Sequence, residues 1–305
     1  MTIAFDEYLE AKYALDNRSF NPAVRGAFLS ALKQYTQLSG LDVGTGTGAM
    51  LRRVIDANLR FPLKLTGVDC QKDLLALART KISQQLENQG FSVNSDGNEV
   101  RCKGNDREVH VSFECGYLDA FFSDIPQQAF DLITTHAVMD LLPLLPTLEK
   151  FAAHLTDSGL LYSTINYDGD TSLLPVYDDP KFERQLLDNY NASMEKRQIF
   201  GELTGGAYAG RRIHTALSKT GFKVIAVGSS DWNITPLDGT YRDQDAICLV
   251  ALLDMIRGEN VACANVDASA LIEWHEQRLY ELEQGNLGMI VHQLDIFARK
   301  MDRNH

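Results

Sequence analysis

The sequence has few cysteines, few basic residues and no long apolar run, and each shortage excludes a class of protein. Its five cysteines are an odd number spread over 305 residues, and none forms a C-x-x-C pair. We therefore expect neither a disulfide framework nor a metal site. No stretch approaches the roughly 20 apolar residues that span a bilayer, and the acidic first segment is unlike a secretion signal. These shortages predict a cytoplasmic protein without a membrane partner.

Positive charge is also scarce, which bears on the choice of partner. The chain carries 29 Lys and Arg against 41 Asp and Glu, a formal net charge of −12. An acidic surface repels phosphate backbones unless bases gather locally. The nearest to such gatherings are "MEKRQ" (194–198) and "GRRIH" (210–214), and neither is dense. We do not expect a nucleic-acid partner.

Short β-branched runs alternate with longer segments of helical spacing, which is typical of βαβ units and a parallel sheet. The predicted strands are 38–44, 63–69, 109–114, 130–136, 159–166, 222–228 and 287–299. The predicted helices include 21–35, 49–58, 72–88, 144–155, 179–198, 211–221, 242–258 and 267–285. The pattern predicts an α/β fold with a doubly wound, mostly parallel seven-stranded sheet and helices on both faces.

Two segments interrupt this alternation. Residues 92–108 are polar and rich in turn signals ("SDGN", "GND"), which predicts a surface hairpin before the third strand. Residues 168–210 form a second interruption, with a helix and then a glycine-rich connector. We divide the chain into an N-terminal helical cap (1–36), a core (37–166), a helical lid or substrate insertion (167–210) and a C-terminal part that completes the sheet with extra helices (211–305).

The stretch "LDVGTGTG" (41–48) follows the first predicted strand and precedes a helix. Gly44, Gly46 and Gly48, with Ala49 behind them, also fit the turn that binds dinucleotides, and a lone match of this kind is weak. Asp42 argues against a dinucleotide, because a carboxylate beside the turn would oppose a pyrophosphate. S-adenosylmethionine brings an ammonium group instead of a phosphate. An NAD-type ligand remains the minor alternative.

With these residues in place, the chain resembles the class I S-adenosylmethionine-dependent methyltransferases. The likeness lies in "LDVGTGTG" (41–48), in "LTGVDCQKDLLALAR" (65–79) and in "AFDLITTHAVMDLLP" (129–143). It covers residues 10–165 well and 207–300 more loosely. It implies a Rossmann-like fold, S-adenosyl-L-methionine as cofactor and methyl transfer as reaction. It does not identify the acceptor, because one fold serves many reactions.

The resemblance implies a role for individual residues. The glycines would let the backbone approach the methionine and ribose portions, Asp42 would face the ammonium, and Asp69 would accept hydrogen bonds from both ribose hydroxyls. Asp119 would meet the adenine amino group, although Gly116 or Tyr117 can occupy that position and Asp119 can equally be a solvated acid. The expected cofactor-binding residues are Asp42, Gly44, Thr45, Gly46, Gly48, Asp69, Cys70, Leu118, Asp119, Thr135 and His136.

A general base is required only if the nucleophilic atom of the methyl-accepting substrate carries a proton when it binds. His136 follows the fourth predicted strand, and an ordinary histidine pKa lies near 6.5, so we expect it to act as the base. Its alternatives are contact with the cofactor or packing beneath a loop. Asp140 lies one helical turn further on. It either orients His136 or caps a helix.

Residues beyond the later strands are candidates for the acceptor pocket. They are Tyr167, Asp168, Arg211, Asp231 and Trp232. Each has a purely structural alternative: a plain turn for Tyr167 and Asp168, a cation that is solvated or bridges acids for Arg211, and a buried pair for Asp231 and Trp232.

The sequence thus predicts a methyltransferase that acts on oxygen, nitrogen or carbon of a small-molecule acceptor. A protein methyltransferase and a non-catalytic S-adenosylmethionine-binding protein are the alternatives. A homodimer is left open.

Overall fold

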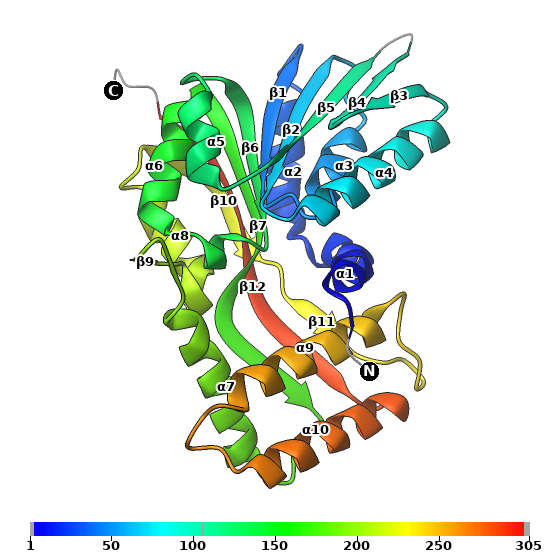
Figure 1. Cartoon of the computed structure of the whole chain (residues 1–305), viewed down its shortest axis with the longest axis vertical. Coiled ribbons are helices and arrows are strands. Elements are labelled where there is room, and N and C mark those ends of the chain that lie inside the picture. The colour runs from blue at the N-terminus through cyan, green and yellow to red at the C-terminus, as the bar shows by residue number, and fades with distance from the viewer. Residues whose placement is uncertain (1–2, 105–106, 302–305) are drawn as a thin grey trace.

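The structure is a computed structural model that describes residues 3–104 and 107–301. At its centre, seven strands lie in the order β5, β2, β1, β6, β7, β12, β10, and only β12 runs antiparallel to its neighbours (Figure 1). This confirms the predicted doubly wound, mostly parallel sheet. The strands are β1 (Leu38–Val43), β2 (Leu63–Asp69), β5 (Glu108–Cys115), β6 (Phe130–His136), β7 (Leu155–Leu174), β10 (Phe222–Ser229) and β12 (Gly288–Lys300).

Three further strands enlarge this sheet to ten in the described part of the chain. The predicted hairpin is present as β3 (Ser92–Asp96) and β4 (Glu99–Lys103), and β4 pairs antiparallel with β5 at the sheet edge. Asn105 and Asp106, in its second predicted turn, lie outside the described residues. The third addition, β11 (Trp232–Ile234), pairs with β12. It was not predicted, because three residues are too few to show an alternating pattern.

Helices cover both faces of the sheet. One core cluster joins the sheet to α2, α3 and α4, and a second joins its other face to α5, α6 and α8. The bounds are α2 (Pro22–Leu32), α3 (Ala49–Ile55), α4 (Lys72–Asn88), α5 (Leu118–Asp124), α6 (Leu144–His154) and α8 (Ala209–Leu217). Asn21 caps α2, since its side-chain oxygen accepts the N–H groups of Ala23 and Val24. No helix in the described ranges is long and apolar enough to cross a membrane.

Strands β7 and β12 continue past the ends of their neighbours and bend as they do so. The sequence predicted a strand over 159–166, but β7 runs from Leu155 to Leu174. Ile165 adopts a φ of +55° within it, and the pairing register shifts between Leu294 and Ile296 of β12. The buried carboxylate of Asp295 accepts the Ile165 N–H at 2.8 Å and so holds this irregular turn of the strand.

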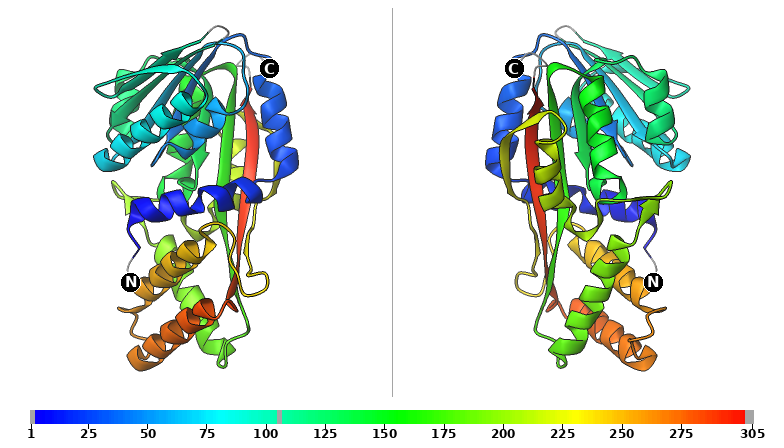
Figure 2. Two further views of the ribbon diagram at one scale, coloured as in Figure 1. Left: turned by 90° about the vertical axis from the view of Figure 1, so that its right-hand side faces the viewer. Right: turned by 90° about the vertical axis from the view of Figure 1, so that its left-hand side faces the viewer.

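Three helices surround the extended part of these strands: α7 (Pro180–Glu195), α9 (Asp245–Asn260) and α10 (Ala268–Glu283). Arg278 on α10 is fully buried and donates to Glu183 on α7 at 2.6 and 2.9 Å, which ties the two helices together. The first helix, α1 (Phe5–Ser19), lies between this helical layer and the main sheet (Figure 2). A short hairpin, β8 (Gln198–Ile199) and β9 (Glu202–Leu203), follows α7.

Candidate active site

A cavity of about 540 Å³ opens at the carboxyl ends of β1, β2, β5 and β6 and extends along β7 and β12. This edge is where open α/β sheets bind ligands. We call its two ends the upper and lower parts. The upper part is lined by residues 42–47, 68–71 and 116–119. The lower part is lined by Tyr8, Tyr167, Tyr190, Met194, Trp232, Leu252, Met255, Ile256, Met289, Val291 and Gln293.

The glycine turn forms one wall of the upper part. Gly44, Gly46 and Gly48 all have positive φ values, between +52° and +78°. A Cβ at Gly44 would lie 2.5 Å from a methyl group of Val138, so only glycine fits there. Gly48 does not line the cavity; it precedes α3, and a Cβ there would press on Ala78 at 3.1 Å. At Gly44 and Gly46 the turn therefore presents backbone to the cavity.

Asp42 lies beneath this turn and is buried. Thr45 and Thr134 each donate a hydroxyl to one of its carboxylate oxygens at 2.7 Å. Burial raises the pKa of Asp42 to about 6, against the opposing effect of these two hydrogen bonds. The residue lines the cavity, so a cationic group of a ligand would favour its charged form.

Asp69 ends β2 at the opposite wall of the upper part, with Cys70 beside it. One carboxylate oxygen accepts the Gly46 N–H and the other accepts the Gln71 N–H, both at 2.9 Å. These bonds fix the orientation of the carboxylate. Each oxygen retains a second lone pair, so Asp69 can still accept two hydroxyl groups from a ligand.

Leu118 and Asp119 begin α5 and also line the upper part. The side chain of Asp119 is 61% exposed and pairs with Lys150. Asp119 is therefore a solvated, paired acid at the cavity's edge. Tyr117 precedes it and contacts Phe200 of the β8–β9 hairpin edge-to-face, with ring centroids 5.4 Å apart.

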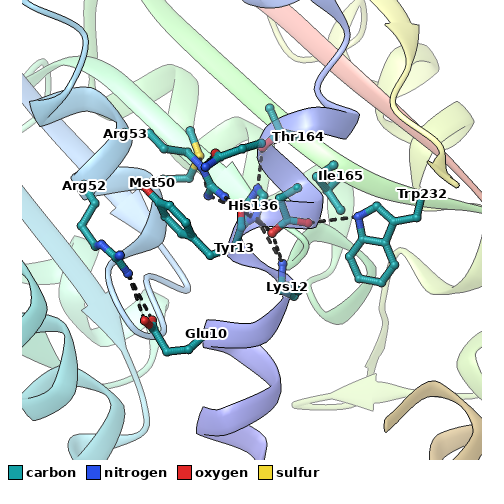
Figure 3. Close-up of polar contacts among 12 residues, drawn as sticks. Glu10, Lys12, Tyr13, Met50, Arg52, Arg53, His136, Thr164, Ile165 and Trp232 are labelled. Atoms are coloured by element: carbon teal, nitrogen blue, oxygen red, sulfur yellow. Dashed lines mark hydrogen bonds and ion pairs between the residues drawn. The ribbon is translucent and has the colours of Figure 1, made fainter. Parts of the chain in front are cut away.

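His136 ends β6 within a buried group of charges (Figure 3). Its Nε2 lies 2.8 Å from an Asp16 carboxylate oxygen, and its Nδ1 lies 2.8 Å from the Thr164 hydroxyl. Lys12 donates to the same Asp16 oxygen at 2.7 Å, and the indole N–H of Trp232 donates to the other at 3.0 Å. We call Lys12, Asp16, Arg53, His136 and Trp232 the Asp16 cluster.

The protonation state of His136 follows from these contacts. Burial and the positive charge of Lys12 together lower its pKa to about 3, against the attraction of Asp16. Lys12 Nζ and an Arg53 guanidinium nitrogen also lie 3.2 and 3.4 Å from Nε2. We assign the proton of the neutral ring to Nε2, facing the nearer Asp16 carboxylate, and Nδ1 then accepts the Thr164 hydroxyl. Neither ring nitrogen keeps a free lone pair for an acceptor.

Asp140 lies four residues further on, in a short 3₁₀ helix, and also lines the cavity. It does not contact His136; its nearest charged partner is Arg197, at 3.7 Å. Burial raises the pKa of Asp140 to about 6, and Arg197 partly offsets this. Its carboxylate is therefore able to bind a proton near neutral pH.

The residues predicted for the acceptor pocket separate into two groups. Tyr167 and Trp232 line the lower part of the cavity. Asp168 and Arg211 instead pair with each other at 2.9 Å outside it, and Asp231 pairs with His292 at 2.8 Å. The reason is strand alternation: adjacent residues of β7 face opposite sides of the sheet. Thr135 is likewise turned away and donates to Ser163 at 2.8 Å.

Sequence reasoning missed the contribution of α1 and α9. Tyr8, Leu9 and Lys12 line the cavity from α1, and Leu252, Met255 and Ile256 line it from α9. Their spacing of one, three and four residues is a helical face. That signal was present in the sequence, but an amphipathic face does not reveal whether it packs on the sheet or on a cavity.

No group of three or more His, Cys, Asp or Glu residues in the described ranges is arranged to hold a metal ion.

Comparison with known proteins identifies the family. A family model for a methyltransferase domain matches residues 11–227. A protein of Bacillus halodurans described as a candidate methyltransferase has a TM-score of 0.50 at 15% identity, over 90% of this chain and 98% of that one. The geranyl diphosphate C-methyltransferase of Streptomyces coelicolor has a TM-score of 0.43 at 12% identity, over 92% and 81% of the two chains. No curated protein sequence matches.

The chain belongs to the methyltransferase domain family, because the matched segment covers more than half of it. It is an S-adenosylmethionine-dependent methyltransferase with the class I, Rossmann-like fold.

The Asp16 cluster allows a test of stability. Asp16→Ala removes the one described carboxylate within 4 Å of Lys12 and Arg53. We expect the free energy of unfolding to fall by about 3–5 kcal/mol, the cost of leaving a buried charge unpaired. Asp188→Ala is the matched control, because Asp188 is 57% exposed in its pair with Arg184 and should cost less than about 1 kcal/mol. Urea unfolding of both variants measures the difference, and equal losses would contradict the expectation.

Proposed function

We propose that this methyltransferase acts on a small, mainly apolar acceptor held in the lower part of the cavity. The observation that carries the proposal is the lining there: apolar and aromatic side chains from α1, α7, α9, β7, β11 and β12. Such concave, mostly apolar chambers suit small molecules. Protein acceptors need an open groove, and α1, α7 and α9 instead contribute lining residues to this chamber.

The upper part of the cavity suits the cofactor. Asp69 would accept the ribose hydroxyls, Asp42 would favour the ammonium group, and the turn around Gly44 and Gly46 would allow close backbone approach. The fit rests on the spare lone pairs of Asp69 and on the raised pKa of Asp42, which a neighbouring cation would lower. When bound, the cofactor supplies an activated methyl group, so the protein has to position the acceptor, exclude water and take up any proton.

Asp140 is the better candidate for the proton acceptor. It lines the cavity with a pKa near 6, whereas both ring nitrogens of His136 are engaged. We assign His136 to positioning: it connects β6 to α1 through Asp16. Tyr167 would border the acceptor, and its hydroxyl is oriented by donation to Asn191 at 2.8 Å.

The acceptor class is tested by incubating the protein with S-adenosylmethionine labelled in its methyl group and fractionated cell extract. We expect the label to enter small molecules. Label in protein would support the alternative of a protein methyltransferase. Cofactor binding in calorimetry without any transfer would support a non-catalytic binding protein.

Asp69→Ala tests the cofactor site. The loss of hydrogen bonds to a charged, partly buried oxygen should weaken S-adenosylhomocysteine binding by about 1–3 kcal/mol, roughly 5- to 150-fold in Kd. Asp73→Ala is the control, since Asp73 is exposed on α4 and does not line the cavity. Isothermal titration calorimetry gives both affinities, and an unchanged Kd in Asp69→Ala would rule out its ribose role.

Asp140→Asn tests the proton acceptor. If the carboxylate takes a proton from the acceptor, kcat/KM should fall as the pH drops below about 6, where Asp140 becomes protonated. The asparagine variant should lose this limb and about 10²- to 10⁴-fold in kcat. His136→Gln should keep the limb. A pH profile that persists in Asp140→Asn and vanishes in His136→Gln would reverse the two assignments.

A further inference from the structure

The Asp16 cluster contains two cations and a single carboxylate. Lys12 lies 2.7 Å and Arg53 lies 3.7 Å from the same Asp16 oxygen. The side chains of Lys12 and Asp16 are 5% and 1% exposed, so solvent screens them little. Burial and Lys12 keep the pKa of His136 low, so its ring adds no positive charge near neutral pH. Among the groups in contact, Lys12 and Arg53 carry two positive charges and Asp16 carries one negative charge, which leaves one positive charge in excess.

Other carboxylates nearby are occupied. Asp42 senses the charge of Arg53, and each of its oxygens accepts one threonine hydroxyl; its remaining lone pairs belong to the upper part of the cavity, which Asp42 lines. Asp295 accepts the N–H groups of Ile165 and Asn21 at 2.8 and 2.9 Å. Neither forms an ion pair within 4 Å of Lys12 or Arg53 among the described residues. A buried charge without a partner of opposite sign is costly. The excess positive charge therefore favours a ligand that carries a negative charge.

Lys12 presents this surplus to the cavity. It lines the cavity wall, whereas Arg53 does not. Its ammonium lies 5.7 Å from the centre of the Trp232 ring, in the lower part. Of its three N–H donors, one binds Asp16, and His136 Nε2 also lies 3.2 Å from the Lys12 nitrogen. Leu9, almost one turn earlier on α1, is the residue that approaches the glycine turn, with its methyl group 3.3 Å from where a Cβ of Gly46 would be. Lys12 thus faces the acceptor's end of the cavity.

Gln293 independently indicates a polar ligand group in the lower part, although its amide oxygen calls for an O–H or N–H donor and not for the anion itself. It lines the lower part, it is 4% exposed, and its amide oxygen has no hydrogen-bond partner in the described structure. Buried amide oxygens in native proteins are rarely left without a donor. The lower part therefore combines a buried cation, an unpaired amide and an apolar wall.

We propose that the acceptor carries an anionic group, a carboxylate in the simplest case, that binds Lys12, and that its remaining body is an apolar ring or chain lying against Trp232, Met289 and Val291. This inference rests on the proposed function, because it assigns the lower part of the cavity to the acceptor. It narrows the substrate class to amphipathic acids.

The wild-type protein gives the first test. With S-adenosylhomocysteine present at saturation, thermal unfolding is measured with phenylacetate, indole-3-acetate and decanoate, and with the primary amide of each. At least one acid should raise Tm in a concentration-dependent manner, and its amide should bind at least tenfold more weakly. If no acid stabilises the protein, or if acids and amides act equally, the proposal is wrong.

Variants at position 12 give the second test. Lys12→Gln should abolish the preference for the acid over its amide, and Lys12→Arg should retain it because it keeps the charge. Lys33→Gln is the control, since Lys33 is exposed at the end of α2 and away from the cavity. If Lys12→Gln does not unfold cooperatively, the comparison of each acid with its amide on the wild-type protein decides, and equal effects of the two overturn the inference.

The cofactor also has a carboxylate, and the same variants show whether Lys12 binds that group or the anionic group of the acceptor. S-adenosylhomocysteine and 5′-methylthioadenosine, which lacks the amino-acid portion, are titrated by calorimetry. We expect Lys12→Gln to change neither affinity by more than about threefold. A tenfold loss for S-adenosylhomocysteine alone would assign Lys12 to the cofactor's carboxylate and overturn the inference. Failure of both compounds to bind the wild type would instead contradict the proposed function.

Discussion

The structure depends on the way one buried carboxylate, Asp16, joins three separate segments. It accepts from Lys12 on its own helix, from His136 at the end of β6 and from Trp232 on β11. These contacts fix α1 between the main sheet and the helical layer. Because α1 supplies Tyr8, Leu9 and Lys12 to the cavity, the shape of the lower part follows from this single anchor.

Features with a local cause were predictable from the sequence. The alternation of apolar runs gave the seven core strands, and α4 begins and ends at the predicted residues 72 and 88. The glycine turn and Asp69 were recognisable because their chemistry lies within a few residues of one strand end. The cavity walls contributed by Asp42, Gly44, Gly46 and Asp69 were therefore anticipated, although their contacts with a ligand remain proposals.

Features that depend on distant partners were not predictable. Nothing near His136 indicates that Asp16, 120 residues earlier, engages its ring and removes its free lone pair. Asp168 and Tyr167 were both predicted to line the acceptor pocket. Strand β7 continues through them, however, so their side chains lie on opposite faces of the sheet and Asp168 pairs with Arg211. Whether the apolar face of α1 packs on the sheet or lines a cavity depends on tertiary packing, which the local sequence does not show.

The two long strands have a mechanical consequence. Since β7 and β12 form the sheet beside the upper part of the cavity and also the wall of its lower part, the two ends share one continuous, hydrogen-bonded backbone. A hinge between them would break that ladder. The β8–β9 hairpin, whose Phe200 packs edge-to-face on Tyr117, lies outside this ladder. The spacing between the two ends of the cavity is accordingly set by the sheet.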